Sequence, residues 1–131
     1  MNPHNILNFD NTFAIVGASA DPDRYGYELV HVMHQAGYKV FPVNPKYKEI
    51  IGIPCYPSLH DIPEKPDVVI TALAPGNSIK AIETAAGLGI KSIWMPPDCW
   101  SDEAIAKCKS LNLNFVNDIC PIYLIKLKER K

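Results

Sequence analysis

The chain has 131 residues, of which 47% are hydrophobic, and 13 basic and 14 acidic side chains give it a net charge of −1. This composition predicts one globular domain, spanning residues 1–131, and excludes an extended disordered chain. The balanced charge offers no attraction for nucleic acid or an anionic membrane surface, and we interpret the basic run at 126–131 as a solvated helix end.

Strands and helices alternate along the sequence. Apolar runs predict strands at 13–16, 38–43, 53–56, 67–73, 91–95 and 115–117. Apolar residues at helical spacing, with capping residues beside them, predict helices at 25–35, at 76–88, after Ser101, and at 123–129. This alternation is typical of an α/β fold with a mostly parallel sheet.

Right-handed crossovers then give a single Rossmann-like, doubly wound sheet in the order 3-2-1-4-5-6, with helices on both faces. Pro54 and Pro57 restrict the 53–56 strand to an edge, because proline cannot donate to a central ladder. Ligands of such sheets bind beyond the carboxyl ends of the strands, where the strand order reverses. We therefore expect the site between the first and fourth strands.

The turn after the first strand has the composition of a phosphate-binding loop. Gly17, Ala18 and Ser19 leave the backbone amides uncovered at the start of a helix, and Arg24 can add a bidentate charge. The pattern is not G-x-G-x-x-G, because the next glycine is Gly26. Taken alone, the turn is equally compatible with an ordinary strand-to-helix connection.

The loop after the second strand offers a cation where a simple NAD site would offer an acid. Asn44, Pro45 and Lys46 follow the strand, and the first acid is Glu49. A lysine there suits a ribose that carries a phosphate, as in NADP and coenzyme A. On its own, Lys46 is also compatible with a solvated loop residue; the first loop favours the phosphate interpretation.

Three stretches resemble the CoA-binding domain family. They are Ile-Val-Gly-Ala-Ser with Arg24 downstream, Val-Phe-Pro-Val-Asn-Pro-Lys, and Gly-Ile-Pro-Cys-Tyr-Pro-Ser-Leu, and the resemblance extends from Thr12 to Pro121. The family includes small stand-alone proteins and the CoA domains of the succinyl-CoA synthetase alpha subunit and of NDP-forming acyl-CoA synthetases.

The resemblance implies a binding site for coenzyme A or acyl-CoA. Gly17, Ala18, Ser19 and Arg24 would face the phosphates, and Asn44, Pro45 and Lys46 would hold the adenosine end and its 3′-phosphate. The remaining residues expected to bind the cofactor are Tyr25, Pro42, Ala72, Leu73, Ala74, Pro75, Trp94, Met95 and Pro96. The segment Met95 to Trp100 departs from the pattern of the stand-alone members, which leaves the pantetheine end open.

Candidates for catalysis are few. Glu28, His31 and His34 lie one turn apart on a helix, but no fourth metal ligand is evident. Cys99 could form a mixed disulfide with the CoA thiol, although Asp98 beside it disfavours a reactive thiolate. No Ser-His-Asp or Cys-His arrangement can be assembled, so we expect no catalytic residue and no metal.

Three functions remain open. The first is a CoA-binding module without catalysis of its own; the second is an NADP-dependent reductase or redox sensor. The third is the CoA-binding half of an acyl-CoA ligase, which would act with a separate protein partner. The alternative to such a partner is a homo-oligomer of this chain. We expect a cytoplasmic protein with reduced thiols, because the sequence has no secretion signal, no apolar run that spans a bilayer and no C-x-x-C pair.

Overall fold

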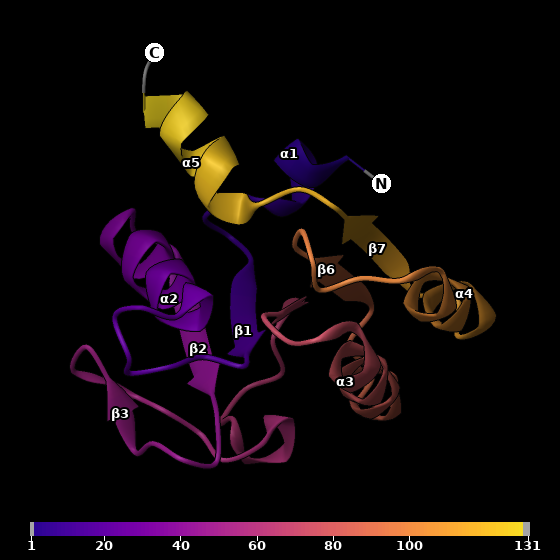
Figure 1. The fold of residues 1–131 in the computed structure, drawn as a ribbon, viewed down its shortest axis with the longest axis horizontal. Coiled ribbons are helices and arrows are strands. Elements are labelled where there is room, and N and C mark those ends of the chain that lie inside the picture. The colour runs from indigo at the N-terminus through magenta and orange to yellow at the C-terminus, as the bar shows by residue number, and fades with distance from the viewer. Residues whose placement is uncertain (1, 130–131) are drawn as a thin grey trace.

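The computed structural model describes residues 2–129, and a parallel sheet of five strands forms its centre (Figure 1). The strands follow the order β2-β1-β5-β6-β7. Their bounds are β1 Thr12–Val16, β2 Lys39–Val43, β5 Val68–Thr71, β6 Ser92–Met95 and β7 Asn114–Asn117. This arrangement confirms the predicted α/β fold class, with the order reversing between β1 and β5.

Helices cover both faces of the sheet (Figure 1). Helices α2 (Tyr25–Gln35) and α5 (Pro121–Glu129) lie on one side, and α3 (Pro75–Gly87) and α4 (Asp102–Ser110) on the other. Side chains alternate between two buried clusters along β1, with Phe13 and Ile15 in the first and Ala14 in the second. A short helix, α1 (Pro3–Ile6), precedes the sheet and contributes Ile6 to the first cluster.

The predicted edge strand at 53–56 is not a member of the central sheet. Strands β3 (Glu49–Ile50) and β4 (Ile53–Pro54) instead form a small antiparallel hairpin around Ile51 and Gly52, which both have positive φ. Tyr56 pairs with the edge of β2 through a parallel bridge to Val43. The prolines at 54 and 57 have no N–H to continue the ladder, and a 3-10 turn, Leu59–Asp61, follows.

The predicted helices begin at or within two residues of the expected positions. Ser101 caps α4 by accepting a hydrogen bond from the amide of Ala104. Helix α3 begins one residue earlier than predicted, at Pro75, and α5 begins two residues earlier, at Pro121. In the basic run, Lys128 donates a hydrogen bond to the carbonyl of Leu7; residues 130 and 131 lie outside the described part.

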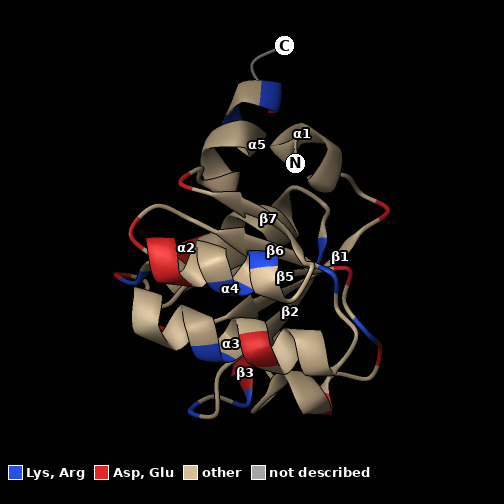
Figure 2. Cartoon of the chain, turned by 90° about the vertical axis from the view of Figure 1, so that its right-hand side faces the viewer, with Lys and Arg blue, Asp and Glu red and all other residues tan. Residues whose placement is uncertain are grey.

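Acidic and basic residues are interspersed along the elements drawn in Figure 2. Within residues 2–129, no helix combines the length and apolar character needed to cross a bilayer.

Candidate functional site

Three adjoining hollows lie at the carboxyl ends of the strands, where the strand order reverses. The central hollow, of about 420 Å³, is lined by residues of the first and second loops together with Gly26, Tyr47 and 72–74. The Asn77 hollow, of about 310 Å³, shares Gly17, Asn44 and Leu73 with it. The cysteine hollow, of about 430 Å³, shares four residues with the central hollow: Tyr25, Ala72, Leu73 and Ala74.

The first loop brings three backbone segments into contact. Gly17 has a φ of +93°, and a Cβ there would lie 2.2 Å from the carbonyl oxygen of Ala72. A Cβ on Gly26 would lie 2.1 Å from the carbonyl oxygen of Gly17. Both positions therefore require glycine, because any side chain would separate α2 and the β5 loop from the end of β1.

Three amides of this loop have no acceptor within the described chain, and Ser19, which carries one of them, lines the central hollow. The N–H of Gly17 is bonded to the carbonyl of Val43, but the N–H groups of Ala18, Ser19 and Ala20 donate to no acceptor among residues 2–129. Helix α2 also begins without a side-chain cap. Unpaired amides beside the positive end of a helix form an anion-binding arrangement.

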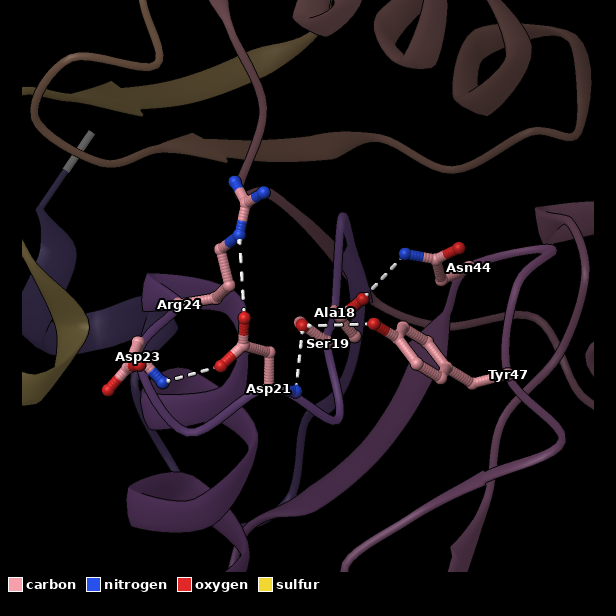
Figure 3. A network of polar contacts seen from close by, with 7 residues as sticks. All are labelled: Ala18, Ser19, Asp21, Asp23, Arg24, Asn44 and Tyr47. Atoms are coloured by element: carbon pink, nitrogen blue, oxygen red, sulfur yellow. Dashed lines mark hydrogen bonds and ion pairs between the residues drawn. The ribbon is translucent and has the colours of Figure 1, made fainter.

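Ser19 and Arg24 contribute polar side chains to the same loop (Figure 3). The Ser19 hydroxyl accepts a hydrogen bond from the amide of Asp21 at 3.0 Å and lies 3.4 Å from the hydroxyl of Tyr47. Arg24 is the N-cap residue of α2, and its guanidinium lies 4.0 Å from the Asp21 carboxylate with three quarters of its side chain exposed. A cation at the positive end of a helix is unfavourable by itself and suits a bound anion.

Asn44 joins the second loop to the first. Its side-chain amide donates to the carbonyl of Ala18 at 2.8 Å (Figure 3). Its side-chain oxygen accepts from the amide of Lys46 at 2.9 Å. The Lys46 side chain is exposed and lines the central hollow, with its ammonium 5.6 Å from the centre of the Tyr47 ring. Within the described chain, Lys46 has no carboxylate within ion-pair distance.

The remaining predicted site residues divide into two groups. Ala72, Leu73 and Ala74 line the hollows, and Pro45 lines the Asn77 hollow. Pro42 is buried within β2, and Pro75 is half-buried as the first residue of α3. Neither of these two prolines lines one of the three hollows.

The structure does not bring the predicted residues at the end of β6, Trp94, Met95 and Pro96, to the hollows. Trp94 and Met95 are fully buried and pack in the clusters on opposite faces of the sheet, and Pro96 is buried beside them. The Trp94 indole donates to the carbonyl of Ile119 at 2.7 Å. Because β6 is an interior strand covered on both faces, its last residues serve the core.

Sequence reasoning missed one side of the Asn77 hollow. Asn77, Lys80, Ala81 and Thr84 of α3 line it, opposite Ser58 of the segment after β4. These α3 positions are spaced i, i+3, i+4 and i+7, so they form one helical face, and Lys80 adds a third cation to Arg24 and Lys46. The spacing was visible in the sequence, but an exposed helical face alone does not indicate a ligand.

The cysteine hollow holds two thiols and a phenol. The Tyr25 hydroxyl lies 2.9 Å from the sulfur of Cys120, and Cys99 lines the same hollow with 6% of its surface exposed. Burial raises the pKa of Tyr25, and the contact with Cys120 adds to that rise. Burial also raises the pKa of the Cys99 thiol. No three His, Cys, Asp or Glu residues between positions 2 and 129 are grouped to hold a metal ion.

Comparison with known proteins places the chain among CoA-binding domains. Residues 11–126 match the family model described as a CoA binding domain. The chain is 36% identical over 77 residues to an ADP-forming acetate–CoA ligase of Archaeoglobus fulgidus, covering 59% of this chain and 11% of the ligase. It is 29% identical over 119 residues to YneT of Bacillus subtilis, an uncharacterized protein, covering 88% of this chain and 85% of YneT.

Among solved structures, a hypothetical protein from Pyrococcus horikoshii OT3 superposes with a TM-score of 0.82 at 35% identity, covering 88% of this chain and 81% of that chain. The resemblance thus takes two forms: this chain matches a small part of the much longer ligase, but most of YneT and of the Pyrococcus protein. Because the family model spans nearly the whole chain, the protein belongs to the CoA-binding domain family.

Proposed function

We propose that this protein binds coenzyme A or acyl-CoA across the three hollows and does not itself catalyse a reaction. The observation that carries the proposal is that Ser19, whose amide is unpaired, and Lys46 line one central hollow. Two anion-binding groups at one hollow match a ligand with a diphosphate and a separate ribose phosphate, which is the nucleotide half of coenzyme A.

The residues fit such a ligand at the diphosphate end. The glycines at 17 and 26 let the end of β1, the β5 loop and α2 pack closely, so that the uncapped start of α2 lies beside the first loop. Arg24 and the Ser19 hydroxyl belong to the same loop and would complete the phosphate contacts. Asn44 would keep the two loops at a fixed separation through its bond to Ala18.

The adenosine end would lie toward the Asn77 hollow. That hollow is lined by the apolar side chains of Val16, Val43, Leu59 and Leu73, which suit an aromatic base. Lys46 would hold the 3′-phosphate from the central hollow, and Lys80 would supply additional positive charge. The pantetheine arm would run in the opposite direction, over Ala72–Ala74 into the cysteine hollow, which shares these residues.

A second candidate function is that of a cofactor-binding half that acts with a separate, larger partner in the cytoplasm. The similarity to a portion of an ADP-forming acetate–CoA ligase favours this candidate. Purification from the native host, followed by mass spectrometry of stably associated proteins, tests it. A stoichiometric companion supports the partnership, and a protein recovered alone contradicts it.

Isothermal titration with CoA, acetyl-CoA and NADPH tests the binding proposal. All three carry a diphosphate and a ribose phosphate, but on NADP that phosphate is at the 2′ position and the other end is a nicotinamide. We expect saturable binding of CoA and acetyl-CoA. Tighter binding of NADPH, accompanied by a change in nicotinamide fluorescence, would instead favour the reductase or redox-sensor alternative. Binding of none of the three would contradict both.

A further inference from the structure

The cysteine hollow assembles reactive groups from four separate segments. Tyr25 comes from α2, residues 72–74 follow β5, residues 97–99 follow β6, and Cys120 precedes α5. Its titratable lining groups are Tyr25, Asp98, Cys99 and Cys120. Because Tyr25 and residues 72–74 also line the central hollow, a flexible arm that leaves the phosphate loops along these residues reaches the two thiols.

The two thiols are not equivalent. Cys99 is 94% buried, and burial raises its pKa, so its thiolate is disfavoured. Cys120 is half-buried, and its carbonyl accepts a hydrogen bond from Leu124 in the first turn of the nine-residue helix α5. The Cys120 sulfur is therefore the less buried of the two thiols that line this hollow.

Tyr25 contacts the Cys120 sulfur directly. Its hydroxyl lies 2.9 Å from the Cys120 sulfur, and its pKa is raised by burial, so the hydroxyl keeps its proton and can donate it in a hydrogen bond to the sulfur. The hollow is therefore lined by a half-buried sulfur that contacts a hydroxyl donor, and it lies where the proposed path of a thiol-bearing arm would end.

We propose that Cys120 is a thiol–disulfide exchange site for the disulfide form of the bound cofactor; this inference rests on the proposed CoA function. The Cys120 thiolate attacks one sulfur of CoA disulfide, a bond forms between the Cys120 sulfur and that sulfur, and the original disulfide bond breaks. One CoA leaves as a thiolate, which takes up the proton that Cys120 lost. The oxidant is the CoA disulfide itself.

Mass spectrometry of the intact protein after incubation with CoA disulfide tests the inference, with peptide mapping to locate the adduct. We expect one CoA per chain, attached at Cys120 and released by dithiothreitol. Modification should be at least about tenfold faster than with glutathione disulfide, because the nucleotide half raises the effective concentration of the reacting sulfur. Cys120→Ser should abolish the adduct, and Cys108→Ser, at a fully buried thiol outside the hollow, should leave it unchanged.

Two further measurements separate this inference from the binding proposal. Titration of the reduced wild-type protein with reduced CoA reports binding alone. If CoA binds but the disulfide leaves no adduct, or one on Cys55 or Cys99, the exchange inference is overturned while the binding proposal stands. If reduced CoA does not bind and glutathione disulfide modifies Cys120 as fast as CoA disulfide, both are overturned. Tyr25→Phe serves as a second variant, in which slower exchange supports the role of the hydroxyl and an unchanged rate contradicts it.

Discussion

The side-chain amide of Asn44 donates a hydrogen bond to the carbonyl oxygen of Ala18 across 26 positions of sequence, at a distance of 2.8 Å. The same side chain accepts a hydrogen bond from the amide of Lys46. One asparagine thus fixes the distance between the unpaired amides after β1 and the lysine after β2. These are the two groups that the proposed function requires at one hollow.

Replacing Asn44 with alanine should therefore weaken both stability and binding. The Ala18 carbonyl and the Lys46 amide would lose their partner, which we expect to lower the free energy of unfolding by about 1 to 2 kcal/mol. Urea denaturation measures the first effect and titration with CoA the second. Asn77→Ala is the matched control for stability, since the Asn77 side chain makes no hydrogen bond within the described chain. Equal stability losses in the two variants would argue against the bridging role of Asn44.

Alanine at Gly17 should be strongly destabilising. The added Cβ would lie 2.2 Å from the Ala72 carbonyl oxygen, and φ is positive, so we expect a loss of about 3 kcal/mol or more in the free energy of unfolding. Gly87→Ala is the control: no atom lies within 4 Å of a Cβ at this helical position, and helix propensity predicts a gain of about 0.5 to 1 kcal/mol. Thermal unfolding measures both, and a Gly17→Ala protein as stable as the wild type would refute the close approach.

Removing the buried hydroxyl of Thr71 should raise the stability of the folded protein. It is fully buried at the end of β5, and its hydroxyl has no hydrogen-bond partner among the described residues. Thr71→Val keeps the shape and removes the unpaired group, so we expect the free energy of unfolding to rise by about 1 kcal/mol. Thr84→Val removes a hydroxyl that bonds to the Lys80 carbonyl, and should bring no such gain. A loss of stability in Thr71→Val would mean that this hydroxyl has a partner in solution.

Stability should decline at alkaline pH, partly through Cys108. Burial raises the pKa of this thiol from 9.0 to about 11 in the folded protein. Below pH 9 the thiol is protonated in both states and its contribution is intact; between about pH 9 and 11 the unfolded chain loses the proton first, so stability falls as pH rises. In urea denaturation across this range, Cys108→Ala should show a shallower decline than the wild type. Parallel declines would show that Cys108 does not contribute.

Much of the fold could be predicted from the sequence because its signals are local. The apolar runs, the glycine turn at 17 and the Ser101 cap each determine structure within a few residues, and the central strand order then follows from crossover handedness. The prediction of an edge strand at 53–56 was wrong, although the prolines at 54 and 57 were recognised as unfavourable to a central strand. The chain folds into a hairpin there because Ile51 and Gly52 have positive φ, and no familiar turn motif in the sequence indicates this.

The site was less predictable where it depends on packing between distant segments. Loop composition pointed to Gly17, Asn44 and Lys46, which do lie at one hollow. It could not show that Trp94 is directed into the core, since tryptophan suits a ligand wall and a core equally well. Nor could it show that Tyr25 contacts Cys120, because 95 positions separate them and only the docking of α5 beside α2 brings them together.

The 3′-phosphate provides the most direct test of the central claim, that Lys46 and the loop amides share one nucleotide. The measurement is isothermal titration of the wild type, Lys46→Glu and Lys48→Glu with CoA and with 3′-dephospho-CoA. We predict that the wild type and Lys48→Glu bind CoA at least about tenfold more tightly than the dephospho form, because a charge-assisted contact contributes about 1.5 to 3 kcal/mol. Lys46→Glu should lose that preference. Equal affinity of the wild type for both ligands, or a preference that survives in Lys46→Glu, would contradict the account.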